Sequence, residues 1–274
     1  MSTARQVDIE VENDDTFDAP VVVSSDTAST TQSDVSREIA EIADGYQRAG
    51  VEETQPRLDY PPYRSSLLRH PTKDLQHADP EDIELWSPCF GERDVGPLEA
   101  DLTIQHDGEP QGQRIVVHGR VRESGGRAVP DTLVEIWQCN AAGRYRHVVD
   151  QHPAPLDPNF SGGGRCVTDR EGRFRFITIK PGAYPWGNHH NAWRPAHIHF
   201  SVFGRAFVQR LVTQMYFPAD PLFFQDPIYN SVPEGARERM ICRFDLEQTI
   251  PEWALAFQFD IVLRGREATP MENE

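Results

Sequence analysis

Apolar residues follow a period of two along most of this chain, from about residue 101 onward. Such alternation, enriched in β-branched and aromatic residues, is typical of β-strands. Turn signals rich in Gly, Pro and Asp separate the apolar segments, and no long amphipathic helix competes with them. Within this region a short helix is expected only over 232–240. We predict strands over residues 114–121, 132–138, 173–179, 196–203, 208–217 and 256–263.

Many strands without helical crossovers predict an all-β fold, an antiparallel β-sandwich of two sheets with long loops. We expect this domain to span residues 101–270. The preceding residues 56–100 are marked by prolines, which fix φ and remove a backbone donor, so they predict an irregular, extended N-terminal arm.

Residues 1–55 differ in composition from the rest of the 274-residue chain. They hold thirteen Asp or Glu against three Arg, whereas the remaining residues carry a net charge of only −6. Their Ser- and Thr-rich, apolar-poor sequence predicts a largely disordered acidic extension, with one short helix expected over 36–47. This extension is interpreted either as a docking arm for another subunit or as a solvated tail.

Charge, apolar runs and cysteine spacing exclude several classes of function. The net charge of −16 argues against nucleic acid as a partner. Apolar runs stay well short of the roughly 20 residues of a membrane span, and the first residues lack the apolar segment of an export signal. The four cysteines are far apart (Cys89, Cys139, Cys166 and Cys242), which favours reduced thiols in the cytoplasm.

Two histidines, His197 and His199, lie two residues apart in a predicted strand. Side chains at i and i+2 of a strand point to the same face, so the two imidazoles are neighbours. They are either half of a metal site or a pair of hydrogen-bonded interior histidines.

Tyr145 and Tyr184 follow predicted strands and are candidate partners for the histidines. Phenolate is a hard anionic donor, and two phenolates with two imidazoles suit a trivalent cation, so Fe(III) fits best. The alternative is that both are ordinary loop tyrosines.

Several long motifs in order resemble the intradiol ring-cleavage dioxygenases. They are LVEIWQ (133–138), NAAGRYRH (140–147), APLDPNF (154–160), TIKPGAYPW (178–186) and WRPAHIHF (193–200). Within that family, YPPYRSS (60–66) and FDIVLRG (259–265) also resemble the beta chains of protocatechuate-cleaving enzymes. The resemblance extends from about residue 60 to 266.

The resemblance implies a β-sandwich enzyme with a non-haem Fe(III) ion held by Tyr145, Tyr184, His197 and His199. It implies cleavage of protocatechuate by O2 to 3-carboxy-cis,cis-muconate, with Tyr184 leaving the metal when substrate binds. It also implies a hetero-oligomer with an alpha chain of the same fold.

Further matched positions carry roles implied by the resemblance. Arg194 would stabilise negative charge on the substrate ring and Gln214 would hydrogen-bond near the reacting oxygens, although a structural ion pair is the alternative for Arg194. The positions expected to line the substrate pocket are Tyr63, Arg69, Trp137, Trp186 and Ile228. Plain core packing is the alternative for the two tryptophans and Ile228.

Two other functions remain open at this point. One is an intradiol enzyme for catechol or hydroxyquinol, which would usually carry a helical N-terminal region. The other is a non-catalytic β-sandwich subunit, which would not need all four ligands. The resemblance assigns no role to residues 1–55, to His189 or to His190, and it does not give the oligomer size.

Overall fold

The computed structural model describes residues 37, 54–73, 95, 96, 98–188, 190–203 and 210–272. The chain divides by its internal contacts at residues 46 and 47, and everything described here except Arg37 belongs to the second unit, 47–274. Apart from Arg37, the expected helix over 36–47 and the acidic extension up to residue 53 lie outside the described residues.

One sheet contains five strands, with β1 at its centre. β1 pairs antiparallel with β4 on one side and parallel with β10 and β11 on the other, and β9 pairs with β10 at the edge. The strands of this sheet are β1 (Arg114–Arg122), β4 (Arg173–Ile179), β9 (Arg243–Ile250), β10 (Ala254–Gln258) and β11 (Ile261–Val262).

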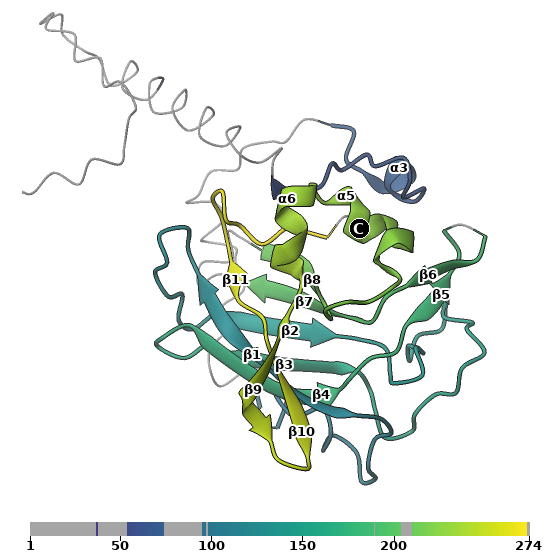
Figure 1. The fold of residues 1–274 in the computed structure, drawn as a ribbon, viewed down its shortest axis with the longest axis vertical. Coiled ribbons are helices and arrows are strands. Elements are labelled where there is room, and N and C mark those ends of the chain that lie inside the picture. Colours follow the sequence, from purple (N-terminus) through teal and green to yellow (C-terminus); the bar gives the residue numbers. More distant parts are fainter. Residues whose placement is uncertain are drawn as a thin grey trace, which may run out of the picture. The chain divides into compact units, whose positions relative to one another are not determined.

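A second sheet of four antiparallel strands has the order β3-β2-β7-β8. Its strands are β3 (Gly163–Val167), β2 (Leu133–Trp137), β7 (His197–Phe203) and β8 (Arg210–Tyr216). A two-stranded ribbon, β5 (Tyr184–Trp186) with β6 (Ala192–Arg194), precedes β7 in the chain. In Figure 1 this ribbon lies beyond the end of β7.

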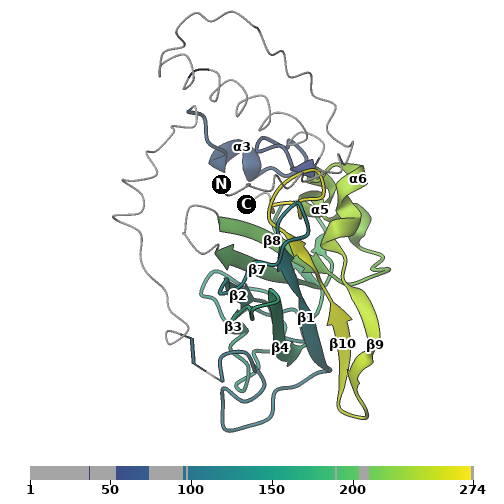
Figure 2. The same ribbon diagram turned by 90° about the vertical axis from the view of Figure 1, so that its left-hand side faces the viewer.

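The core lies between the two sheets, which occupy opposite sides of the view in Figure 2. Alternate residues of β1 and β4 meet alternate residues of β2 and β7, as the strand period of two requires. Examples from the two layers are Val117 and Phe176 on one side and Ile198 and Phe200 on the other, all at most 1% exposed. The prediction of a two-sheet β-sandwich is confirmed.

Two of the β1 pairings are parallel, whereas the prediction was an antiparallel sandwich. β10 comes more than a hundred residues after β1, so no hairpin constrains the direction in which the two strands run. At Gly119 the backbone of β1 and the backbone at Phe259 approach so closely that an added Cβ would lie 1.8 Å from the Phe259 carbonyl oxygen. Only glycine fits this position.

Short helices connect β8 to β9 and lie beside the β7–β8 side of the molecule (Figure 1). The short helix expected over 232–240 is confirmed as two turns in succession, whereas α5 was not predicted. The arm expected to be extended contains a turn and the helix α3. The helical elements are α3 (Ser66–Arg69), η2 (Phe223–Gln225), α5 (Pro227–Ser231), α6 (Glu234–Arg237) and η3 (Glu238–Met240). Within the described residues, no helix has the length and apolar character needed to cross a membrane.

Candidate metal centre

The two histidines of β7 lie on the face of the four-stranded sheet that points away from the sandwich core. Ile198 and Phe200 point into the core, so the alternating His197 and His199 point to the opposite face. Both histidines are nevertheless buried, and their ring centroids are 4.9 Å apart. The expected side-by-side placement of the two imidazoles is confirmed.

Each imidazole uses its Nδ1 atom for a hydrogen bond. His197 Nδ1 lies 2.7 Å from the Pro195 carbonyl oxygen, and His199 Nδ1 lies 2.9 Å from Glu272 Oε2. The Pro195 carbonyl can only accept and Arg194 can only donate, so in His197 Nδ1 carries the proton and Nε2 is the accepting nitrogen. A carboxylate acceptor at Nδ1 gives His199 the same tautomer. Burial, and then the nearby Arg194, hold the pKa of His197 well below its ordinary value. His197 is therefore neutral, as a metal ligand must be.

Two loops bring the tyrosines to the histidines. Tyr145 lies in the loop after β2, and Tyr184 begins β5. The Cys139 thiol donates to the Gly182 carbonyl, 3.3 Å away, and the Gly182 amide donates to the Asn140 carbonyl, 3.0 Å away. These bonds fasten the two loops together at their bases.

The tyrosine rings complete a compact group with the histidines. The ring centroids of Tyr145 and Tyr184 are 5.5 Å apart, and Tyr184 lies 5.5 Å from His197. The Tyr145 ring lies 6.4 Å from His199, and the Tyr184 hydroxyl lies 3.4 Å from His197 Nε2. The structure thus places the side chains of all four predicted ligands next to one another.

The surroundings of the phenols suit a cation. Burial, followed by the neighbouring Tyr184, raises the pKa of Tyr145 well above its ordinary value, and burial also raises the pKa of Tyr184. The Tyr145 hydroxyl is buried and makes no well-formed hydrogen bond among the described residues, although the Tyr184 phenol lies beside it. A buried polar group without a partner is costly, and a metal ion would both satisfy it and favour its ionisation.

The donor set fits a metal only if the phenols take part. No cluster of three or more His, Cys, Asp or Glu able to hold a metal occurs among the described residues. Two imidazole nitrogens and two phenol oxygens make four donors, and hard phenolates favour a trivalent ion over zinc. The residues therefore fit the expected Fe(III).

Arg194 in β6 connects the centre to a buried polar network. Its guanidinium is 3.1 Å from His197 Nε2 and 3.4 Å from the Tyr184 hydroxyl. It also donates to Gln214 Oε1 at 2.6 Å and to Asp226 Oδ2 at 2.9 Å. Burial opposes the charge, but Asp226 together with Tyr184 and Tyr216 more than offsets this, and the pKa of Arg194 lies well above its ordinary value. Arg194 is thus a permanent cation beside the four donors.

Cross-strand register places two of the other predicted residues beside His199. Trp137 on β2 and Gln214 on β8 are the direct neighbours of His199 across the sheet. The Trp137 ring stacks on the His199 ring, with centroids 4.7 Å apart and planes at 8°. Adjacent side chains on one face of a sheet pack in this way.

The arm residues lie against the β5–β6 ribbon. The Tyr63 ring is 5.4 Å from the Trp186 ring. The Arg194 guanidinium lies over the same Trp186 ring, 5.3 Å from its centroid. Arg69 hydrogen-bonds to the Tyr63 hydroxyl. The arm is held there by Asn188, whose side chain accepts from the Arg64 amide at 3.0 Å. Tyr63 therefore contacts Trp186, which contacts Arg194 beside the four donors, and Arg69 is connected to this group by its hydrogen bond to Tyr63.

The remaining predicted positions are less directly connected to the donors. Ile228 is buried in α5, and its amide donates to the Asp226 carboxylate at 3.0 Å. His190 is exposed in the turn before β6, and His189 lies outside the described residues.

Three residues of the network were not predicted from the sequence. The Tyr216 hydroxyl donates to Gln214 Oε1 at 2.7 Å, Asp226 pairs with Arg194, and Glu272 contacts His199. The sequence could have indicated Tyr216, because it lies two residues after Gln214 and the two side chains therefore point to the same face of a strand. Asp226 precedes Pro227 as a helix cap would. Glu272 had no sequence signal.

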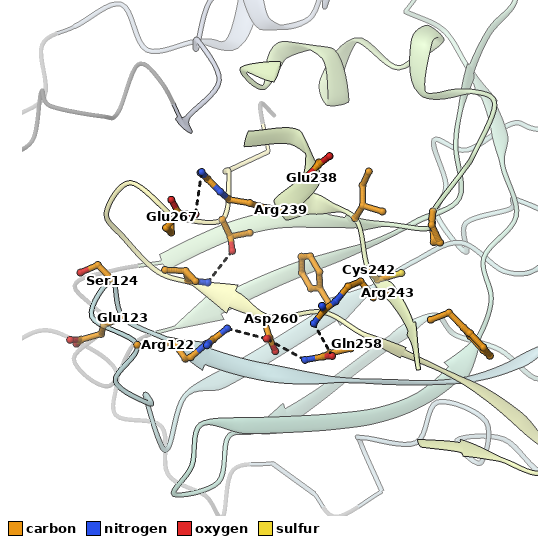
Figure 3. A pocket seen from close by; sticks show the side chains of 17 residues that line it. Arg122, Glu123, Ser124, Glu238, Arg239, Cys242, Arg243, Gln258, Asp260 and Glu267 are labelled. Carbon is orange, nitrogen blue, oxygen red and sulfur yellow. Dashed lines mark hydrogen bonds and ion pairs between the residues drawn. The ribbon is translucent and has the colours of Figure 1, made fainter. Parts of the chain in front are cut away.

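A separate cleft of about 880 Å³ lies between β1, β9 and the residues after β11 (Figure 3). Arg122 pairs there with Asp260 at 3.0 Å, and Arg239 pairs with Glu267 at 3.4 Å. Arg243 donates to the Gln258 side chain at 3.1 Å. The cleft shares no residue with the tyrosine–histidine centre, and two of its arginines are already paired with carboxylates of its own lining.

Comparisons with known proteins agree with this geometry. The profile of the family described as "Dioxygenase" matches residues 85–265, and that of "Protocatechuate 3,4-dioxygenase beta subunit N terminal" matches residues 46–81. A protocatechuate 3,4-dioxygenase beta chain from Burkholderia cepacia is 60% identical over 222 residues, which cover 80% of this chain and 94% of the relative.

Other relatives are less similar in sequence. A catechol 1,2-dioxygenase from Acinetobacter baylyi is 31% identical over 192 residues, which cover 65% of this chain and 57% of that relative. The solved structure of catechol 1,2-dioxygenase from Acinetobacter sp. ADP1 aligns with a TM-score of 0.48 and 22% identity, over 87% of this chain and 81% of that one.

Proposed function

Because this chain belongs to the intradiol ring-cleavage dioxygenase family, we propose that it is the iron-binding beta chain of an enzyme that cleaves protocatechuate with O2. The single observation that carries the proposal is the convergence of Tyr145, Tyr184, His197 and His199 into one compact group, in which both histidines are buried. The reaction consumes one O2 and opens the ring between its two hydroxyl-bearing carbons, giving 3-carboxy-cis,cis-muconate.

Fe(III) would be held by Tyr145, Tyr184, His197 and His199, and it supplies the Lewis acidity that lets the catechol bind as a dianion and react with O2. The neutral His197 and the fixed tautomers of both histidines support this assignment. The raised pKa of Tyr184 supports a role as a proton acceptor, because its phenolate would be a strong base toward a substrate hydroxyl.

The residues around the donors support the binding of a flat, anionic substrate. Arg194 carries a permanent charge beside the Tyr184 hydroxyl, where negative charge would develop on the substrate. Trp186 and Tyr63 offer aromatic surfaces that would exclude water and pack on a ring. The exposed Arg69 guanidinium is our candidate for the substrate carboxylate, which only a protocatechuate-type substrate carries. Gln214 would hydrogen-bond near the reacting oxygens.

The proposal includes a partner and a location. The match of residues 46–81 to the beta-subunit N-terminal family supports pairing with an alpha chain in a hetero-oligomer. Cys139, Cys166 and Cys242 are free thiols, which supports the reducing cytoplasm.

The test is product analysis of the full-length chain co-expressed with a protocatechuate 3,4-dioxygenase alpha chain and loaded with iron. Supplied with protocatechuate and ¹⁸O2, it is expected to form 3-carboxy-cis,cis-muconate containing both labelled atoms. His197→Ala is expected to lose activity, whereas His190→Ala, a matched change of an exposed histidine, is expected to retain it.

Other outcomes distinguish the alternatives. Faster turnover of catechol or hydroxyquinol than of protocatechuate would replace the substrate assignment while keeping the reaction class. Failure of the iron-loaded complex to consume O2 with any of the three catechols would overturn the proposal in favour of a non-catalytic subunit.

A further inference from the structure

Residues 268–272 form a segment that lies along the edge of the four-stranded sheet. The Glu272 amide donates to the Val212 carbonyl of β8 at 2.9 Å, and the Thr213 hydroxyl donates to the Pro270 carbonyl at 2.6 Å. The Met271 amide donates to the Gln55 side chain at 2.7 Å. Segment 268–272 is therefore fixed from both sides, and its position determines where the Glu272 carboxylate lies.

The Glu272 carboxylate lies beneath the metal-facing residues of β7 and β8. Its Oε2 atom is 2.9 Å from His199 Nδ1 and 2.6 Å from Gln214 Nε2. The Glu272 side chain is 1% exposed and that of His199 is 5% exposed. A carboxylate buried this deeply is costly unless its lone pairs are engaged by such donors.

The orientation of Gln214 is fixed by its two neighbours. Arg194 is only a donor and donates to Gln214 Oε1, while an ionised carboxylate is only an acceptor and receives the Nε2 hydrogen. The amide thus has one allowed orientation, which directs a donor at Glu272. The Glu272 Oε2 atom therefore accepts from both Gln214 Nε2 and His199 Nδ1.

The two histidines have unequal partners. His197 donates to a neutral carbonyl, whereas His199 donates to an anion. A carboxylate acceptor fixes the tautomer and ring orientation of a metal-binding histidine. It also makes the other ring nitrogen a stronger electron-pair donor to the metal. His199 is therefore the more electron-rich of the two imidazoles.

We infer that Glu272 is a positioning residue, which aims His199 Nε2 at the metal and strengthens it as a ligand. The inference rests on the proposed function, since it requires a metal held by Tyr145, Tyr184, His197 and His199. It assigns segment 268–272, distant in sequence from all four ligands, to the support of the metal centre.

The experiment compares Glu272→Gln and Glu272→Ala with Glu267→Gln in the full-length protein. Glu267→Gln is the matched control, because Glu267 lies in the same part of the chain but is 76% exposed and paired with Arg239. Fe(III) affinity is measured by competition with EDTA, and the visible phenolate-to-iron band is recorded for each loaded protein.

Loss of the outer carboxylate of a metal–histidine pair typically weakens metal binding by about 10–100-fold, and we expect this for Glu272→Ala. Glu272→Gln keeps an acceptor but loses the charge, so its loss is expected to be smaller. The band is expected to move to longer wavelength in both variants, because a poorer imidazole donor leaves the metal a better electron acceptor. Glu267→Gln is expected to match the wild type.

Two results would overturn the inference. One is an unchanged affinity and an unchanged band in both Glu272 variants. The other is a weaker affinity with an unmoved band and a lower melting temperature of the metal-free protein, which indicates a merely structural role. Failure of the wild-type protein to bind Fe(III) would instead refute the proposed function, so the two failures are distinguishable.

Discussion

Arg194 is the residue at which the buried polar contacts of the candidate metal centre converge. Its guanidinium and the Asp226 carboxylate are 3% and 0% exposed, and 2.9 Å separates them. Buried pairs of this kind contribute little net stability as pairs, but removing one partner leaves an uncompensated charge. The position of Arg194 therefore matters for stability as well as for the proposed chemistry.

Replacing Arg194 by methionine is expected to destabilise the protein by about 3–5 kcal/mol, because Asp226 remains buried and unpaired. The double variant Arg194→Met/Asp226→Asn is expected to recover part of that loss. Urea unfolding monitored by circular dichroism gives the free energy of unfolding of the double variant and of each single variant, Arg194→Met and Asp226→Asn. A double variant as unstable as the sum of the two single variants would show that the residues do not act as a pair.

At the residue scale, the sequence was informative where the chemistry is local. His197 and His199 could be placed together because a strand alternates its faces. Tyr145 and Tyr184 were candidate ligands from their position after predicted strands, and the family motifs implied the same pair. Asp226 and Glu272 could not be predicted, since their roles depend on which distant segments pack against Arg194 and His199.

At the scale of the strands, those with a clear local pattern were predicted, and those without one were missed. Strands with an alternating core face, such as β1, β4 and β7, were predicted almost to the residue. β3 was missed because it begins with two glycines, and β5 and β6 because each has only three residues. β9 alternates, but its apolar Phe244 and Leu246 are exposed at the sheet edge, so they carry no core signal.

The close contact between β1 and the β10–β11 connection makes Gly119→Ala strongly destabilising. The added Cβ would meet the Phe259 carbonyl oxygen at 1.8 Å, and a backbone atom cannot move aside as a side chain can. The cost is expected to reach or exceed the roughly 3 kcal/mol of severe overpacking. Gly125→Ala is the control, since nothing lies within 4 Å of its added Cβ. Equal melting temperatures for the two variants would contradict the close approach of the Gly119 and Phe259 backbones.

Three cysteines are buried at or beside the strands, and their reactivity depends on folding. Burial raises the pKa of Cys139, Cys166 and Cys242 to about 12. Because a raised pKa keeps the reactive thiolate scarce below that pH, a Cys89→Ser variant is expected to resist iodoacetamide at pH 7 to 9 while folded. In urea all three thiols are expected to react, faster as the pH approaches the ordinary thiol pKa near ~8.5. Mass spectrometry counts the adducts, and rapid labelling of the folded variant would refute their burial.

At the scale of the whole molecule, the proposed assembly separates metal binding from turnover. All four proposed ligands belong to this chain, so we expect the chain expressed alone to bind iron. Its turnover of protocatechuate is expected to be poor without an alpha chain, which would share the active-site cleft. Oxygen-electrode rates of the single chain and of the co-expressed pair test this, and full activity of the single chain would show that no partner is needed.

Assembly is also where the sequence was least informative. The family motifs indicate a partner, but oligomer size depends on surfaces whose complementarity no single sequence displays. Most of the acidic residues 1–55 lie outside the matched family regions, which begin at residue 46. Their expected disorder and their role stay predictions.

The central claim is that two phenolates and two imidazoles of this chain bind Fe(III), and the visible absorption spectrum of the iron-loaded protein tests it most directly. A broad phenolate-to-Fe(III) band is expected, which shifts when protocatechuate is added without O2 and which Tyr145→Phe alters. A colourless protein that binds zinc in its place would contradict the account.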